Sequence, residues 1–353
     1  MIMDYIRPEI RALSAYHVPS SEGLIKLDAM ENPYPLPTPL QEILTSSLRS
    51  LSLNRYPDPN ATLLKDEIKR VFSIHPDAAI VLGNGSDEII QMIALAVAKP
   101  NAVVLGVDPS FVMFKMIATF VGMNYVGVPL NHDFALDKNE ILSAINRHQP
   151  EVIFLAYPNN PTGNCFDEET LMAVLETSKK LVVIDEAYFP FTDHTMLSRL
   201  MQFPNLVIMR TLSKLGLAGV RLGFLVGPPD VVNQINKVRL PYNISVLDQE
   251  AALVLLKHYD LFQTQTNSIR VERIRLIQEI SELNQVQLFP SEANFLLLKI
   301  DHAQDVFKRI LERGILIKNL TNAHISLKDC LRVTVGSQQE NTLFLNALKL
   351  ALN

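Results

Sequence analysis

The segment EVIFLAYPNNPTG, residues 151–163, is an apolar run that ends abruptly in a turn sequence. A nearly continuous apolar run of this length is typical of a strand that is buried on both faces. The asparagine, proline and glycine residues that follow it favour a tight turn. Five other runs have the same apolar character: AIVLG (79–83), AVVLGV (102–107), LVVID (181–185), NLVIMR (205–210) and GFLVG (223–227).

Helical patterns lie between these strands, at residues 61–72, 87–98 and 167–179. Strands that alternate with helices predict an α/β fold with a doubly wound, mostly parallel sheet. We assign this large domain to residues 35–245 and expect an N-terminal arm, residues 1–34, before it.

The character of the sequence changes after this large domain. Residues 249–283 predict one or two long helices. The remaining elements are expected as strands at 293–300, 315–320 and 331–336 and as helices at 304–313 and 339–351. Strands with few helical crossovers predict a smaller C-terminal α+β domain, which we place at residues 246–353.

The composition narrows the possible functions. The chain has 353 residues, of which 48% are apolar and 20% charged, and its formal net charge is −5. This negative charge argues against a nucleic-acid partner, which usually needs a concentrated basic surface. No apolar run approaches the length of a membrane span, and the first residues carry charges instead of an apolar signal core. The two cysteines, Cys165 and Cys330, fit reduced thiols of a cytoplasmic protein, with a disulfide between them as the alternative.

Polar residues follow several of the predicted strands, at the sheet edge where ligands collect in open parallel sheets. The first group is GNGSDE (83–88), in which Gly85, Ser86 and Asp87 lead into a helix. Exposed N–H groups at a helix start favour an anion, so one interpretation is a phosphate site. The alternative is a plain helix cap formed by Ser86 or Asp87.

Two further polar groups follow the strands at 151–157 and 181–185. Asn160, in YPNNPTG, would direct an amide toward the same sheet edge, although a plain loop also explains these turn residues. Asp185, in IDEAYFPF, ends a buried strand, where a carboxylate is unfavourable unless a cation lies nearby. A helix cap or a structural ion pair is the alternative, and Tyr188 lies close enough along the chain to face the same ligand.

The stretch TLSKLGLAGVRLGF, residues 211–224, places two cations in apolar, glycine-rich surroundings. Burial would lower the pKa of the Lys214 amine and make it available as a nucleophile. The alternative is a lysine that reaches solvent from a loop, as most lysines do. Arg221 would offer a permanent charge to an anion, together with the hydroxyls of Thr211 and Ser213.

Taken together, these groups supply the partners that pyridoxal phosphate needs. Lys214 is an amine for its aldehyde, Asp185 is a carboxylate for its ring nitrogen, and Asn160 with Tyr188 would bond its ring oxygen. The anion site would take its phosphate. We expect no metal, because the eight histidines form no HxxxH or HxH pair and no Cys/His cluster occurs. No GxSxG motif marks a serine nucleophile.

The motifs NNPTG (159–163), IDEAY (184–188) and TLSKLGLAGVRLGF, in this order and spacing, resemble the class I/II aminotransferases of pyridoxal-phosphate fold type I. Further stretches resemble the branch of that family that acts on histidinol phosphate: LDAMENPYPLP (27–37), NRYPDP (54–59), GNGSDE, PYNIS (241–245), EANFLLL (292–298) and LRVTVG (331–336). The resemblance implies transamination of L-histidinol phosphate with 2-oxoglutarate in histidine biosynthesis. The products would be imidazole-acetol phosphate and glutamate.

The resemblance also implies roles for individual residues in cofactor binding. Lys214 would bind the cofactor covalently and move the substrate proton, Asp185 would pair with the ring nitrogen, and Phe111 would stack on the ring. The other implied contacts are Asn160 and Tyr188 at the ring oxygen and Gly85, Ser86, Asp87, Thr211, Ser213 and Arg221 at the phosphate.

For the substrate, the resemblance implies that Arg332 binds an anionic end and that Tyr16, from the arm, covers it. Tyr56 would reach the cofactor phosphate of a neighbouring subunit, which implies a homodimer with shared active sites. Two positions depart from the family: Met30 stands where many relatives have asparagine, and Lys318 stands where a second arginine is common. Lysine keeps the positive charge but lacks the bidentate geometry of arginine.

Other functions stay open from the sequence. The same pocket would serve an aromatic amino-acid aminotransferase or a decarboxylase of O-phosphothreonine. A cofactor-binding regulator without turnover is an alternative of a different class, although Lys214 is present and the short arm leaves no room for a DNA-binding segment.

Overall fold

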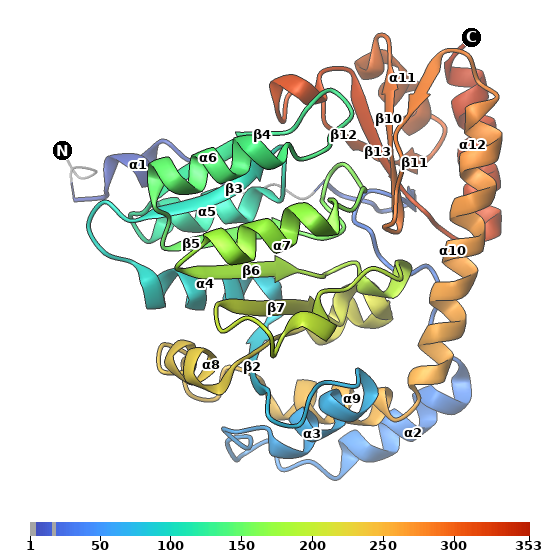
Figure 1. The fold of residues 1–353 in the computed structure, drawn as a ribbon. Helices are drawn as coiled ribbons and strands as arrows, with labels where there is room; N and C mark the ends of the chain where they lie inside the picture. The colour runs from blue at the N-terminus through green and yellow to red at the C-terminus, as the bar shows by residue number, and fades with distance from the viewer. Residues whose placement is uncertain (1–4, 16–18) are drawn as a thin grey trace.

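A computed structural model describes residues 5–15 and 19–353, and its largest element is a seven-stranded sheet (Figure 1). The order of its strands is β2-β8-β7-β6-β5-β3-β4. These strands are β2 (Ala79–Asn84), β3 (Val103–Asp108), β4 (Asn124–Pro129), β5 (Val152–Ala156), β6 (Leu181–Asp185), β7 (Leu206–Thr211) and β8 (Leu222–Gly227). β8 pairs antiparallel with both β2 and β7, while the other pairs are parallel. The prediction of a mostly parallel sheet is therefore confirmed.

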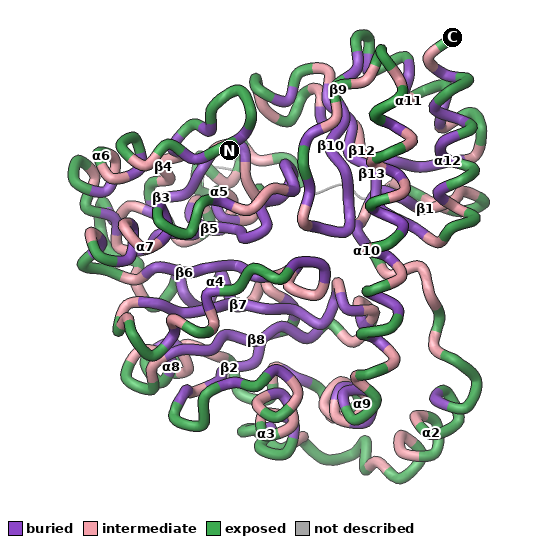
Figure 2. Tube along the Cα trace, turned by 45° about the vertical axis from the view of Figure 1, so that its right-hand side comes forward, coloured by how far each residue is buried: buried purple, intermediate pink, exposed green. Residues whose placement is uncertain are grey.

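Helices cover both faces of this sheet, as a doubly wound fold requires. One face carries α4 (Gly85–Val97), α5 (Val112–Phe120) and α8 (Pro229–Asn236). The other face carries α3 (Thr62–Val71), α6 (Lys138–His148), α7 (Glu168–Thr177) and α9 (Val246–Leu256). Side chains of β5 alternate between the two cores, which is the expected period of a strand. Figure 2 shows the strands as a buried layer between helices with exposed outer surfaces.

A second sheet, with the antiparallel order β12-β13-β10-β9, forms the core of the C-terminal part. Its strands are β9 (Val286–Leu288), β10 (Phe295–Ile300), β12 (Lys318–Asn319) and β13 (Cys330–Thr334). The helices of this part are α10 (Tyr259–Ser281), α11 (Ala303–Leu311) and α12 (Gln338–Ala351). The predicted α+β character is thus observed, while the limits at residues 34 and 245 stay predictions.

The N-terminal segment joins this C-terminal part. β1 (Ile25–Lys26) pairs in parallel with β11 (Ile315–Leu316), and Leu27 and Met30 lie in the same apolar core as β10 and β13. The remaining helices are α1 (Pro8–Arg11), α2 (Thr38–Arg49), a π-helical turn at Ser213–Leu217 and short 3-10 helices at Phe189–Phe191, Leu197–Arg199, Ala218–Val220 and Ile325–Leu327.

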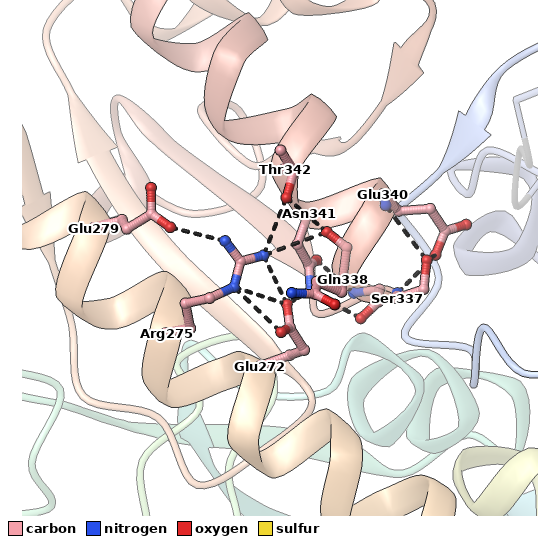
Figure 3. Close-up of polar contacts among 9 residues, drawn as sticks. Glu272, Arg275, Glu279, Ser337, Gln338, Glu340, Asn341 and Thr342 are labelled. Atoms are coloured by element: carbon pink, nitrogen blue, oxygen red, sulfur yellow. Dashed lines mark hydrogen bonds and ion pairs between the residues drawn. The ribbon is translucent and has the colours of Figure 1, made fainter.

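A polar network fastens α12 to the long helix α10 (Figure 3). The buried Asn341 donates its amide to the Glu272 carboxylate at 2.9 Å. Arg275 pairs with Glu272 on one side and with Glu279 on the other, both at 2.8 Å. Ser337 begins α12 with a capping box that satisfies the first N–H groups of the helix. Packing and polar contacts together therefore hold the C-terminal helix in place.

The structure corrects three details of the predicted elements. The edge strand β4 was not predicted, because its sequence NYVGVP mixes polar residues, glycine and proline. The short edge strand β9 also gave no signal. The predicted strand at 315–320 is two strands, because the chain leaves β1 and turns to pair with β13. Ile317, at the break, is as buried as its neighbours, so apolar pattern alone does not reveal the change of partner.

Candidate functional site

The site lies at the edge of the large sheet where the parallel strands end. Asp185 is the last residue of β6 and Thr211 the last residue of β7. Because β8 runs in the opposite direction, its first residues meet the end of β7, and Thr211 pairs with Gly223. The turn between these two strands therefore carries Lys214 and Arg221 to the same edge.

A cavity of about 220 Å³ opens at this edge. Most of its walls come from the segments that the sequence singles out. It is lined by Ala29, Met30, Glu31, Ser86, Asp87, Phe111, Ala156, Asn160, Asp185, Ala187, Tyr188, Thr211, Ser213, Lys214, Ala218 and Arg221.

Lys214 stands in the π-helical turn and points its amine into this cavity. Its Nζ donates to the backbone oxygen of Ala29 at 3.1 Å and lies 6.0 Å from the centre of the Tyr188 ring. Burial lowers the pKa of the amine to about 8, and the positive charge of Arg332 contributes, while Glu31 acts in the opposite direction. A lysine with this pKa holds a useful fraction of free amine near neutral pH, as a nucleophile requires.

Asp185 lies opposite, with 4% of its surface exposed. Its Oδ1 accepts the backbone N–H of Ala187 at 3.0 Å. Burial raises the pKa of this carboxyl group to about 7, and the nearby Asp87 adds to the rise while Lys214 reduces it. A buried carboxylate of this kind is set to pair with a cationic group that enters the cavity.

The start of α4 forms an anion cradle with Arg221. Gly85 has φ +76°, and a Cβ there would lie 2.6 Å from Nη2 of Arg221, so only glycine lets the guanidinium approach. Gly223 serves the same end, because a Cβ there would lie 2.9 Å from the carbonyl carbon of Gly85. Arg221 itself adopts a left-handed backbone with φ 52°.

The donors of this cradle are available to a ligand. No side chain in the described part of the chain caps the first N–H groups of α4. The Thr211 and Ser213 hydroxyls lie 2.9 Å apart, and Arg221 donates to Ser213 at 3.4 Å. Helix-start N–H groups, two hydroxyls and a guanidinium form the donor set of a phosphate site.

Two predicted residues meet across the two sheets. Asn160, in the loop after β5, accepts at Oδ1 from Nη1 of Arg332 on β13 at 2.5 Å. Arg332 also donates to the backbone oxygen of Asp28 at 3.0 Å. Phe111 lines the cavity at the start of α5, with its ring against the edge of Phe114.

Tyr56 and Lys318 are not among the residues that line the cavity. Tyr56 is 79% exposed and stacks on Tyr242 with ring centres 4.3 Å apart. Lys318 is opposite Arg332 in the β12–β13 pairing. Tyr16 lies outside the described residues.

The segment Ala29–Glu31 is the part of the lining that sequence reasoning assigned to no role. Met30 has φ 54°, a left-handed conformation that is uncommon for residues other than glycine and asparagine. Its N–H donates to Oγ1 of Thr334 at 2.9 Å, and its carbonyl accepts from Nδ2 of Asn294 at 3.0 Å. The sequence signal was the methionine at position 30, where many relatives have asparagine, but this difference does not indicate that the residue lines a cavity.

The residues present fit pyridoxal phosphate. Gly85 lets the Arg221 guanidinium approach the start of α4, where N–H groups and two hydroxyls are donors for a phosphate. Lys214 and Asp185 offer an amine and a carboxylate in the lining of the same cavity. Asn160, Tyr188 and Phe111 complete the lining with an amide and two aromatic rings. Among the residues that the structure describes, no group of His, Cys, Asp or Glu side chains could hold a metal ion.

A doubly wound domain with a reactive lysine beside an anion cradle is the architecture of enzymes that work with a phosphorylated aldehyde. The sequence model described as aminotransferase class I and II matches residues 22–348, so the chain belongs to this family. Across residues 5–15 and 19–353, no helix is both long and apolar enough to cross a membrane. Cys165 and Cys330 are both free thiols.

Individual relatives are similar over nearly the whole chain. A histidinol-phosphate aminotransferase of Ralstonia nicotianae is 49% identical over 98% of this chain and 94% of its own length. The solved histidinol-phosphate aminotransferase of Clostridium acetobutylicum has a TM-score of 0.85 at 27% identity, over 94% of this chain and 99% of that one. That of Sinorhizobium meliloti, solved in complex with pyridoxal-5'-phosphate, shares the fold with a TM-score of 0.87 at 23% identity, over 99% and 98% of the two chains.

Proposed function

We propose that this protein is a pyridoxal-phosphate-dependent aminotransferase that moves the amino group of L-histidinol phosphate to 2-oxoglutarate. The products are imidazole-acetol phosphate and glutamate, in the biosynthesis of histidine. The observation that carries the chemistry is the cavity that Lys214, Asp185 and Arg221 line together. The substrate is supported by the 49% identical relative, which is named a histidinol-phosphate aminotransferase.

When bound, pyridoxal phosphate supplies a conjugated ring that takes up the electron pair left by a departing substrate proton. Lys214 would hold the cofactor through its amine and would accept and return the substrate proton. Asp185 would pair as a carboxylate with the ring nitrogen and so favour its protonated form. The remaining roles are those that the resemblance implies: Asn160 and Tyr188 at the ring oxygen, Phe111 on the ring face, and Gly85, Ser86, Asp87, Thr211, Ser213 and Arg221 at the phosphate. All of these residues except Gly85 line the cavity.

Arg332 and Lys318 supply positive charge for the anionic ends of the substrates. Their positions are opposite one another on neighbouring strands, and Arg332 reaches the cavity rim through its bond to Asn160. An arginine fork suits a carboxylate or a phosphate, and lysine suits either as a point charge. Tyr16 would cover the substrate from the arm.

The protein would act as a homodimer with shared active sites. Tyr56 and Tyr242 stack at the surface, and the ring of Tyr56 is 79% exposed. A large exposed aromatic side chain of this kind is set to contact a second copy, where Tyr56 would reach the partner's cofactor phosphate. A cytoplasmic location suits the two free thiols. Sedimentation equilibrium tests the assembly, and a monomer at micromolar concentration would contradict it.

A panel of amino donors tests the function. The purified protein, loaded with pyridoxal phosphate, receives 2-oxoglutarate with L-histidinol phosphate, L-phenylalanine or O-phosphothreonine, and glutamate and carbon dioxide are measured. We expect kcat/KM for histidinol phosphate to exceed that for phenylalanine by about 100-fold, because a site built for a phosphate rejects a donor that leaves its polar groups unpaired. O-phosphothreonine also carries a phosphate, so for this donor the deciding measurement is carbon dioxide, which we expect not to be released. Fast turnover of phenylalanine or decarboxylation of phosphothreonine, with histidinol phosphate ignored, would overturn the proposal.

A further inference from the structure

The segment of residues 29–32 contacts the lysine-bearing turn at two points. At one point, the Ala29 carbonyl accepts the Lys214 amine at 3.1 Å. At the other, Nδ2 of Asn32 donates to the carbonyl of Leu215, the residue after the lysine, at 3.0 Å. One short stretch thus contacts both the reactive end of Lys214 and the backbone that carries it.

The turn is short and irregular. It is a single π-helical turn, Ser213–Leu217, and Gly216 interrupts it with φ 132°. The N–H groups of Leu215 and Leu217 donate to the carbonyl of Leu212, just before the turn, at 3.2 and 3.1 Å. Leu215 is fully buried, and a buried carbonyl that lacks a partner is unfavourable. The Asn32 amide gives this buried carbonyl a hydrogen-bond donor from outside the turn.

The fit between Asn32 and the turn is close. A Cβ added to Gly216 would lie 2.9 Å from Nδ2 of Asn32 and 3.3 Å from Cδ1 of Phe262 on α10. Glycine at this position therefore lets the amide reach the backbone. The hydrogen bond of 3.0 Å to Leu215 then ties the position of Asn32 to that of the turn.

The orientation of the Asn32 amide is fixed on all sides. Besides the bond to Leu215, Nδ2 donates to Oε1 of Gln265 on α10 at 3.0 Å. Oδ1 accepts the N–H of Tyr34 at 2.9 Å. An amide whose two hydrogens and oxygen are all used has one orientation, and rotation would place donors and acceptors wrongly.

We propose that Asn32 is a positioning residue for Lys214. Its bond to the Leu215 carbonyl holds the lysine-bearing turn in the conformation that directs the amine into the cavity. This inference rests on the proposed role of Lys214. Asn32 does not line the cavity, so it acts on the reaction only through the lysine.

The test compares Asn32→Ala with a matched variant elsewhere. Asn319 makes the same local contacts as Asn32: its amide donates to Oε1 of Gln304, and its Oδ1 accepts the N–H of the residue two positions on, Thr321. Asn319→Ala therefore removes the same kinds of bond without touching the turn. Gln265→Met removes the contact of Asn32 with α10 but keeps its bond to Leu215.

The first readout uses the protein without cofactor, so it does not depend on turnover. Lys214 is labelled with trace acetic anhydride between pH 6 and 11, and the pH midpoint of labelling is read by mass spectrometry. We expect the midpoint of the Asn32→Ala variant to rise by about one pH unit as the loosened amine gains water. The second readout is kcat with the cofactor bound, which we expect to fall about 10-fold or more with little change in KM.

Asn319→Ala and Gln265→Met are expected to keep the midpoint and kcat of the unchanged protein. The proposal is overturned if Asn32→Ala also keeps both, or if Gln265→Met reproduces its whole effect, since Asn32 would then only tether the segment to α10. Asn32→Ser, whose hydroxyl can still donate one bond, is expected to be intermediate. Loss of the fold in both Asn32 variants overturns the proposal as well, and failure of the substrate panel alone leaves the labelling result intact.

Discussion

The cavity has two walls of different origin. One wall belongs to the large sheet and consists of the strand ends and turns that carry Asp185, Thr211 and Lys214. The other wall is the segment Ala29–Glu31, and it is held by residues of the C-terminal part. Met30 bonds to Thr334 across 304 positions of the chain, whereas Thr211 and Ser213 bond across two.

The two walls contribute different properties: the sheet wall carries the ionisable groups, and the segment wall sets the shape of the cavity. The sheet wall contains the two ionisable groups that the proposed chemistry uses. Burial raises the pKa of Asp185 and lowers the pKa of Lys214. The segment wall contributes backbone carbonyls and a left-handed residue, whose positions depend on partners far along the chain. Substitutions in the first wall should therefore change chemistry, while substitutions in the second should change stability and alignment.

The largest effect is expected from Lys214→Ala. Removal of the amine should lower transamination by about 10⁴-fold or more, because the amine both holds the cofactor and moves the proton. Borohydride treatment of the loaded protein should no longer trap the cofactor on the chain. Transamination that persists in the Lys214→Ala protein would show that another group holds the cofactor and moves the proton.

Asp185→Asn should change stability in a pH-dependent way. The folded-state pKa of Asp185 is about 7, above the ordinary value of 3.8, so between these values the folded protein keeps a proton that the unfolded chain has lost. The free energy of unfolding therefore falls as pH rises through this window. We expect the cofactor-free variant and the unchanged protein to be equally stable near pH 4 and the variant to be more stable at pH 8, by about 4 kcal/mol at most.

Urea unfolding of both cofactor-free proteins at the two pH values measures this difference. Groups far from the site titrate equally in the two proteins, so the difference between them reports on residue 185 and on the groups coupled to it, Asp87 and Lys214. Equal stability at pH 8 would mean that the carboxylate is compensated within the empty cavity.

The smallest effect is expected in the segment wall, from Thr334→Val. This change keeps the shape of the side chain but leaves the N–H of Met30 without its acceptor, at a cost of about 1–3 kcal/mol. The melting temperature should fall while the labelling midpoint of Lys214 stays near its original value. The exposed Thr45→Val on α2 is the control and should change stability by less than about 0.5 kcal/mol. If both substitutions have the same small effect, the left-handed Met30 does not need its buried partner.

The sequence was sufficient to predict the sheet wall because its information is local. A buried apolar strand followed by a polar residue places that residue at the carboxyl edge, and Asp185 and Asn160 both line the cavity there. Their roles stay predictions. The leucine and glycine residues next to Lys214 in the sequence likewise predicted apolar surroundings for its amine. The apolar residues that bury each of these side chains lie within a few positions of it in the sequence.

The segment wall could not be predicted in the same way. Nothing near Met30 indicates that Thr334 and Asn294 will bond to its backbone, since that depends on how the two ends of the chain meet. The contact of Asn32 with Leu215 has the same long-range character. Edge strands such as β4 were missed for a related reason, because a strand paired on one side needs no continuous apolar run.

The reversed direction of β8 has a consequence for how this site can be altered. Residues 212–221 leave the sheet from β7 and return to it on the adjacent strand, so both ends of this excursion are anchored next to one another. The reactive lysine and the cradle arginine consequently travel on one short closed module, without a crossover helix between them. An exchange of this module between relatives would transplant both cations at once and leave the sheet unchanged.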